Sequence, residues 1–300
     1  MEDFLHLQKK NNVFNAQPKD SPINITTHGS DWYWAVCAVM FASTFAFFGF
    51  MFKVPRTHRL FHYITGSITF VAGIAYFTMA ANLGAVSIPV EFQRSNHLVA
   101  GDAREIFYAR YIDWFITTPL ILADILLTCG LPWPTILFTV VLDEIMVVTG
   151  LIGALVKSQY KWGYFTIGCV AYFMVAYIVI VVGMSHAKAI GQDVNRLFIM
   201  VSVWTLIMWT LYPIAWGLCE GGNVISADSE AVFYGVLDLL AKPVFGSILL
   251  WGHSKIDPAR LGLRIRDVAS ATDRGVADIN KPSAPLRDGP IASSSNDHAA

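Results

Sequence analysis

The chain has 300 residues, of which 55% are hydrophobic and only 14% are charged. A soluble domain carries about 25% charged residues, so this deficit excludes an ordinary soluble fold and places most side chains against lipid or one another. The formal net charge of −1 excludes nucleic acid as a main partner. The four scattered cysteines have neither metal-site nor disulfide spacing, so we expect no bound metal.

Seven apolar stretches approach the length of about 20 residues that a bilayer core demands. They lie near residues 32–52, 60–83, 107–127, 133–155, 164–184, 197–218 and 231–251. The connections between most of them are short, which predicts that neighbours pack antiparallel in one bundle. The sequence therefore predicts an all-α membrane protein, a seven-helix bundle over residues 31–255.

The longest connection, residues 84–105, predicts a small β-hairpin over one mouth of the bundle. Residues 86–92 (VSIPVEF) are typical of a strand, although Pro89 interrupts it, and residues 97–100 would return after a turn at 93–96. Beyond the bundle, residues 256–300 form a tail rich in Ser, Asp, Pro and Ala, which predicts disorder over most of its length.

Lysine and arginine are concentrated in the loops on one side of the bundle, which predicts that this side is cytoplasmic. Those residues are Lys53, Arg56, Arg59, Lys188, Arg196, Lys255, Arg260, Arg264 and Arg266, against Arg94, Arg104, Lys157 and Lys161 opposite. The chain is then a multi-pass protein, which we assign to the plasma membrane. Residues 1–30, with a glycosylation sequon at Asn24, lie outside, and the C-terminus lies in the cytoplasm.

Ionisable residues interrupt three of the apolar stretches. They are Arg110, Asp113, Asp124, Asp143, Glu144, Asp238 and Lys242. Each costs about 2.5–3.5 kcal/mol at a helix centre, so such residues usually face the bundle interior and mark an ion path or a ligand site. A packing network that only joins helices is the alternative.

The third stretch carries its ionisable residues on one helix face. Arg110, Asp113 and Thr117 lie at i, i+3 and i+7, which is one stripe of a helix. Asp124 follows eleven residues after Asp113, about 16 Å further along the axis and on nearly the same face. The face between the two acids is apolar at Leu120. This pattern favours two proton-binding stations over a salt bridge.

The seventh stretch places Asp238 and Lys242 at i and i+4, on one face. A lysine removed from water can be neutral and nucleophilic, the condition for a Schiff base with an aldehyde. Pro243 follows and loosens the helix there, because proline has no amide hydrogen to donate. A plain ion pair of Lys242 with Asp238 or Asp113 is the alternative. Aromatic and small residues on the other helices could line a slot for a long apolar aldehyde, or be ordinary core.

Three motifs resemble those of the microbial (type 1) rhodopsins. Residues 110–120 (RYIDWFITTPL), followed by Asp124, resemble the third-helix signature of that family. Residues 209–213 (WTLYP) resemble its sixth-helix motif, and residues 237–242 (LDLLAK) its retinal-binding seventh helix. The resemblance covers all seven stretches, and the group most resembled is the fungal proton-pumping rhodopsins, similar to bacteriorhodopsin.

The resemblance implies that Lys242 carries all-trans retinal as a protonated Schiff base. It implies that Asp113 is the counterion and primary proton acceptor, hydrogen-bonded to Thr117, and that Asp238 is a second counterion. Asp143 matches a buried structural acid that bonds Thr118. The residues that fit the family's chromophore pocket are Tyr76, Trp114, Thr118, Met146, Gly150, Trp209 and Tyr212.

The resemblance also implies a proton path on either side of Lys242. Arg110 would hold an outer water network, and Asp124 would return a proton from the cytoplasmic side. Glu230 matches one member of an outer proton-release pair. The other member aligns with Gly221, whereas Glu220 stands one position earlier, so early release to the outside stays open. Glu144 has no implied role.

The sequence thus predicts a light-driven outward proton pump, an ion transporter and not an enzyme, whose partners are protons and the lipid bilayer. A slow-cycling sensory photoreceptor of the same fold, with a soluble signalling partner, is the alternative. Asp124 argues against it, because a donor carboxyl speeds the return of the proton. Assembly into a homo-oligomer is left open.

Overall fold

The computed structural model describes residues 11–263, so the predicted tail disorder and the first ten residues of the outer segment lie outside the described residues. Within residues 11–263, seven helices are long and apolar enough to cross a membrane. They are Thr27–Met51 (α2), Leu60–Ala80 (α3), Tyr108–Thr128 (α4), Trp133–Leu155 (α5), Lys161–Ile190, Gln192–Gly221 and Ala227–His253. The predicted fold class is confirmed, and the fifth and sixth helices run several residues further than predicted.

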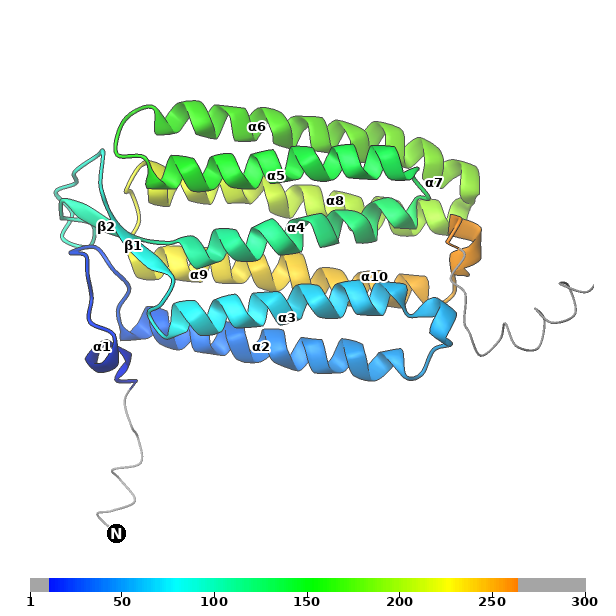
Figure 1. Ribbon diagram of the computed structural model, residues 1–300, viewed down its shortest axis with the longest axis horizontal. Helices are drawn as coiled ribbons and strands as arrows, with labels where there is room; N and C mark the ends of the chain where they lie inside the picture. The colour runs from blue at the N-terminus through cyan, green and yellow to red at the C-terminus, as the bar shows by residue number, and fades with distance from the viewer. Residues whose placement is uncertain (1–10, 264–300) are drawn as a thin grey trace, which may run out of the picture. The chain divides into compact units, whose positions relative to one another are not determined.

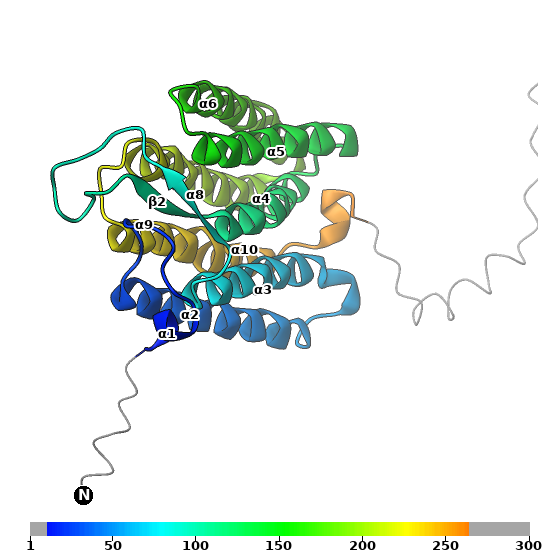
Figure 2. The same cartoon turned by 60° about the vertical axis from the view of Figure 1, so that its left-hand side comes forward.

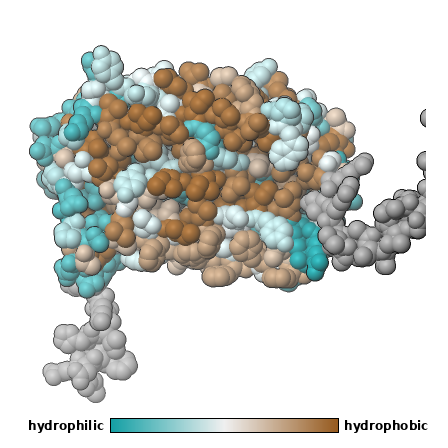
Figure 3. Space-filling model, in the orientation of Figure 1, coloured by the Kyte–Doolittle hydropathy of each residue, from teal (hydrophilic) through white to brown (hydrophobic). Residues whose placement is uncertain are grey.

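The seven helices lie side by side in one bundle (Figures 1 and 2). Chain neighbours such as α2 and α3 pack against each other, and the seventh helix closes the bundle by packing against α2. The space-filling view shows an apolar belt between more polar ends (Figure 3), as expected when lipid replaces water around the middle of a bundle. The ionisable side chains of the apolar stretches are buried inside the bundle, with the exception of Glu144, which is half-buried.

The last three spanning helices each contain a π-helical segment. The fifth consists of α6 (Lys161–Tyr177), η3 (Ile178–Gly183) and α7 (Met184–Ile190). The sixth consists of α8 (Gln192–Trp216) and η4 (Gly217–Gly221), and the seventh of α9 (Ala227–Leu239), η5 (Leu240–Val244) and α10 (Phe245–His253). Pro243 lies inside η5, where its missing amide hydrogen accounts for the wider turn.

A two-stranded antiparallel sheet covers one mouth of the bundle, formed by β1 (Ala85–Pro89) and β2 (Ala103–Phe107) (Figure 1). The hairpin is confirmed, but the return strand predicted at residues 97–100 is wrong. Those residues form turns instead, with the Val99 amide donating to the Asn96 carbonyl at 3.0 Å. The observed strand β2 also bonds to a segment distant in the sequence, because the Glu105 amide donates to the Ile23 carbonyl at 2.8 Å. The alternation of residues within the hairpin connection does not reveal this contact.

Three short helices complete the described chain. They are α1 (Val13–Ala16), η2 (Arg56–His58) and η6 (Pro258–Leu261). The last lies at the end of the bundle opposite the hairpin, where Arg260 makes two bonds to Asp193 at the start of α8, of 2.6 and 2.9 Å. The hairpin end and the opposite end are thus each covered by short structure outside the spanning helices.

Candidate functional site

Lys242 lies at the centre of the bundle between two carboxylates. Its Nζ atom is 2.5 Å from Oδ2 of Asp113 and 3.0 Å from Oδ1 of Asp238. All three side chains are at most 1% exposed, so they interact with one another and hardly with solvent. Asp113 comes from α4, Asp238 from α9 and Lys242 from η5, which brings together the residues that the sequence placed on two separate helices.

The two carboxylates have different hydrogen-bond environments. Asp238 accepts O–H bonds from Tyr76 and Tyr212, each of 2.6 Å, in addition to its contact with Lys242. Asp113 accepts a bond from Lys242, and its Oδ1 atom is buried without a hydrogen-bond partner among residues 11–263. Asp238 is therefore the more fully hydrogen-bonded carboxylate of the two.

The side chain of Thr117 lies next to the carboxyl group of Asp113 and interacts with it. Its hydroxyl donates to the backbone carbonyl of Asp113 at 2.8 Å, one turn earlier in α4. This bond is the usual one for a threonine inside a helix, where the i−4 carbonyl is in reach. Thr118 beside it donates to Oδ2 of Asp143 at 2.7 Å, which ties α4 to α5.

A cavity extends from Lys242 between the helices. Its walls come from α4, α5, α6, α8, α9 and η5, and are mostly aromatic and aliphatic. Of the residues predicted for a chromophore pocket, Trp114, Thr118, Met146, Gly150, Trp209 and Tyr212 all line it. Tyr76 does not line it and instead bonds Asp238. An apolar cavity with a few polar groups at one end is typical of a site for a large hydrophobic cofactor.

Asp124 lies towards the end of α4 that is remote from the hairpin. It is fully buried, and its only side-chain hydrogen bond among the described residues is from the Thr65 hydroxyl at 3.0 Å. Buried apolar side chains, among them Ile121, separate it from the Lys242 centre. One turn further, the Thr128 hydroxyl donates to the Asp124 carbonyl at 2.6 Å and contacts His253 at 2.8 Å.

A second buried cluster lies at the hairpin end of the bundle, next to Arg110. The guanidinium donates to Oε1 of Glu230 at 2.7 Å and to the Tyr33 hydroxyl at 2.8 Å, and it lies over the Tyr234 ring at 4.1 Å from the centroid. Glu220 lies 3.6 Å from the same guanidinium. The structure therefore brings Glu220 and Glu230 together around Arg110.

Arg104 on β2 joins this cluster and was not among the residues singled out by the sequence. It is 1% exposed and bonds Oε2 of Glu230 through Nε at 3.2 Å and through NH2 at 2.7 Å. Arg104 and Glu230 are 126 positions apart in the chain. In the sequence Arg104 appears only as one charged residue of the connection 84–105, and it was used only to assign the sides of the membrane.

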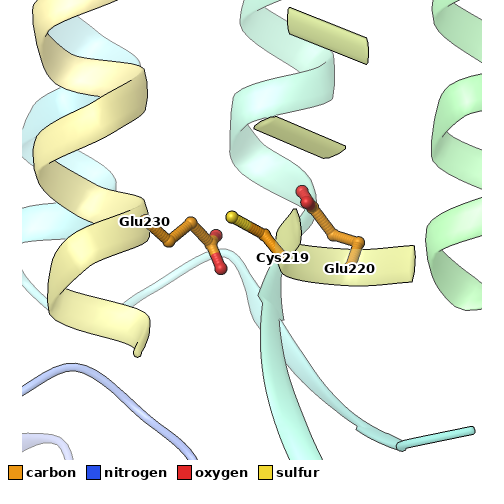
Figure 4. Close-up of side chains that lie close together, drawn as sticks. All are labelled: Cys219, Glu220 and Glu230. Carbon is orange, nitrogen blue, oxygen red and sulfur yellow. The ribbon is translucent and has the colours of Figure 1, made fainter. Parts of the chain in front are cut away.

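Cys219, Glu220 and Glu230 lie close enough to be considered as metal ligands (Figure 4), with donor atoms within 4.8 Å of one another. Both oxygens of Glu230 already accept bonds from guanidinium groups. Two buried arginines supply the positive charge that a cation would bring, and they would repel it. The cluster is better described as a hydrogen-bonded network of acids, tyrosines and arginines.

The comparisons with known proteins agree with this geometry. The family model described as bacteriorhodopsin-like protein matches residues 27–256. The opsin-like protein carO of Fusarium fujikuroi is 63% identical over 273 residues, 89% of each chain. Opsin-1 of Neurospora crassa is 39% identical and covers 77% of this chain and 78% of its own.

The solved structure of a light-driven proton pump from Leptosphaeria maculans is also similar, with a TM-score of 0.74 and 37% identity over 79% of this chain and 98% of that chain. The light-driven proton pump of Coccomyxa subellipsoidea gives a TM-score of 0.72 and 38% identity over 76% of this chain and 98% of that chain. This chain therefore belongs to the bacteriorhodopsin-like family of seven-helix membrane proteins.

Proposed function

We propose that this protein is a light-driven pump that moves protons outward across a membrane, with all-trans retinal bound to Lys242 as a protonated Schiff base. The observation that carries the proposal is a buried nitrogen with two carboxylates in reach, at 2.5 Å for Asp113 and 3.0 Å for Asp238. When bound, retinal supplies light absorption and a change of shape, which no side chain can provide.

The residues around Lys242 fit such a group. A long apolar aldehyde needs a reactive amine at the end of a hydrophobic slot, and the cavity starts at Lys242. Trp114, Trp209 and Tyr212 would hold the chain of the cofactor. Met146 and Gly150 on α5 line the cavity and would leave room for a bulky end, because within 4 Å of a Cβ atom built at Gly150 only Cε1 of Tyr111 is found, at 3.5 Å.

Asp113 is the residue that would accept a proton from the Lys242 nitrogen. It is the nearer carboxylate, and its second oxygen has no partner within the described part of the chain. Both oxygens of Asp238 already accept hydrogen bonds from tyrosine hydroxyls. Asp113 lies three residues from Arg110 and its cluster, so this transfer moves the proton towards the hairpin end.

Asp124 would return a proton to the Lys242 nitrogen from the other side. Burial of an isolated carboxyl favours its neutral form, and the contact with the Thr65 hydroxyl is its only side-chain bond in residues 11–263. Apolar side chains lie between Asp124 and Lys242, and they hinder the free passage of protons between the two groups. One acid on each side of one nitrogen gives the transport its direction.

The outward direction follows from the orientation of the bundle. The loops at the end remote from the hairpin carry most of the lysine and arginine residues, and such loops remain in the cytoplasm. The hairpin end is then outside, and a proton that moves from Asp124 towards Asp113 leaves the cell. Moving one charge against 100 mV costs about 2.3 kcal/mol, which is small beside the energy of a visible photon.

Light-dependent acidification of the medium by cells that express the protein tests the proposal. We expect no acidification from Lys242→Ala, and none or very little from Asp113→Asn. Glu144→Gln, which removes a half-buried carboxyl without a partner among the described residues, is the matched control and should pump normally. Full pumping by Asp113→Asn would refute the assignment of the acceptor.

The sensory alternative is separated from the pump by the length of the photocycle. If Asp124 is a working proton donor, the pump should complete its photocycle without added azide. A cycle of many seconds that azide accelerates strongly would favour the sensor, because azide replaces a missing donor.

A further inference from the structure

His253 is a buried titratable group on the side of Asp124 that is remote from Lys242. It ends α10 and is 8% exposed, and its Nε2 atom lies 2.8 Å from the Thr128 hydroxyl. Its ring stacks on the ring of Phe61, with 3.8 Å between the two centroids. Burial of a polar ring is costly, so this position calls for a reason beyond packing.

The hydrogen bonds of Thr128 define the tautomer of His253. The single hydroxyl hydrogen of Thr128 goes to the backbone carbonyl of Asp124 at 2.6 Å, so its oxygen is left to accept from the imidazole. The neutral ring then carries its hydrogen on Nε2. Its Nδ1 atom is buried without a partner within residues 11–263. His253 therefore has one nitrogen that can take up a proton and one that can give a proton up.

Two further histidines lead from His253 towards the surface. The imidazole of His62, half-buried on α3, lies close enough for its charge to act on His253, and its own Nδ1 atom is buried without a partner in the described part of the chain. Four positions earlier, His58 lies 3.9 Å from Asp257, and these two side chains are 37% and 61% exposed. The series connects the solvent with the interior.

The surroundings of the series favour passage of a proton over its storage. The positive charge of Arg59 acts on His62, and Phe61 and other residues of the apolar core cover His253. A charged imidazole is costly in such surroundings. An Asp124 that has lost its proton would attract the positive charge, because the interaction between opposite charges is strong where water is excluded.

We infer that His253 is the relay through which a proton from the cytoplasm reaches Asp124 after Asp124 has given up its own. Nδ1 binds the incoming proton and the Nε2–H bond breaks. The Thr128 hydroxyl accepts this hydrogen and passes its own to the Asp124 carboxylate. The imidazole is left neutral in the other tautomer, and the starting tautomer returns by proton exchange with water. This inference rests on the proposed function.

Flash spectroscopy of the purified full-length protein with bound retinal separates two steps. Visible absorbance follows the transfer from Asp124 to the Lys242 nitrogen, and the infrared C=O band of Asp124 follows the return of its proton. His253→Phe keeps the stack on Phe61 and has no ring nitrogen. We expect it to leave the first step unchanged and to slow the second by about a hundredfold, the lower end of the range for loss of a proton-transfer group. His186→Phe, which changes a half-buried histidine of α7 at the same end of the bundle, is the control and should slow neither step.

His253→Gln distinguishes a relay from a group that only positions Thr128, because a glutamine amide can donate to the hydroxyl and cannot take up a proton. Slowing of the second step in both variants supports the relay. A normal second step in His253→Gln would overturn it, as would a normal second step in His253→Phe or a slowed first step in both.

Nitrogen NMR of the protein without retinal supplies a readout that does not depend on light. With ¹⁵N-labelled histidine, the signals that disappear in His253→Phe should be those of a neutral ring with its hydrogen on Nε2. A charged ring, or a hydrogen on Nδ1, at neutral pH would overturn the inference. If Asp124 neither loses nor regains a proton in the illuminated wild type, the failure lies in the proposed function instead.

Discussion

Glu105 should make the stability of the protein depend on pH. Its side chain on β2 is only 6% exposed, and its Oε2 atom has no partner among residues 11–263. Burial raises the pKa of this carboxyl from 4.5 to about 7, opposed in part by the Ile25 amide and reinforced by the charge of Glu230. The folded protein therefore binds this proton more tightly than the unfolded chain does.

The sign and size of the effect follow from this difference. Between about pH 4.5 and pH 7 the folded state holds the proton and the unfolded state does not, so stability falls as pH rises. A shift from 4.5 to about 7 at roughly 1.36 kcal/mol per unit gives about 3 kcal/mol lost by pH 8. Glu105→Gln removes the ionisable group and keeps its shape, so the variant should escape this loss.

The measurement is the free energy of unfolding in detergent, followed by circular dichroism from pH 4.5 to pH 8. The difference in unfolding free energy between the variant and the wild type should grow by about 3 kcal/mol from pH 4.5 to pH 8, in favour of the variant. The contributions of the other titrating groups are the same in both proteins and cancel in this difference. Asp102→Asn, which removes an exposed carboxyl of the same hairpin, should show no such trend. A difference between Glu105→Gln and wild type that is constant with pH would refute the reasoning.

Three further outcomes test other parts of the molecule. Asp124→Asn should slow the return of the proton to Lys242 by about a hundredfold or more, the usual range for loss of a general acid, measured by flash absorbance and restored by azide. Gly150→Phe should fold normally by circular dichroism yet form little pigment with added retinal, because the ring would fill the cavity that Gly150 lines. Arg260→Gln should leave the free energy of unfolding nearly unchanged, because its pair with Asp193 is over 40% exposed on both sides.

The seven helices and the Lys242 centre could be predicted because their signals are local. Apolar length defines a spanning helix, and the spacing of Asp238 and Lys242 fixes a shared face whatever the rest of the chain does. The hairpin was predicted from turn residues, but its second strand was misplaced. The register depends on Ile23, which contributes a backbone partner from some 80 residues earlier, and alternation within residues 84–105 does not encode that contact.

The outer cluster was predicted only in part because tertiary contacts define it. Arg104 meets Glu230 across 126 positions, and no periodicity links a strand residue to a helix residue at that separation. The tyrosines Tyr33, Tyr111 and Tyr234 are equally hidden, since buried aromatic residues at helical spacing are typical of ordinary core. Only their hydroxyl contacts distinguish them from packing residues.

The position of Glu220 shows how packing can select which residue completes a site. The resemblance aligns the second outer acid with Gly221, whereas the acid of this chain stands one position earlier, within the π-helical segment η4 (Gly217–Gly221). A Cβ atom at Gly221 would lie 2.7 Å from the Trp216 ring and 2.8 Å from the Trp162 ring. A larger side chain at Gly221 would displace an indole ring, so the acid that joins Glu230 beside Arg110 comes from position 220 and not from position 221.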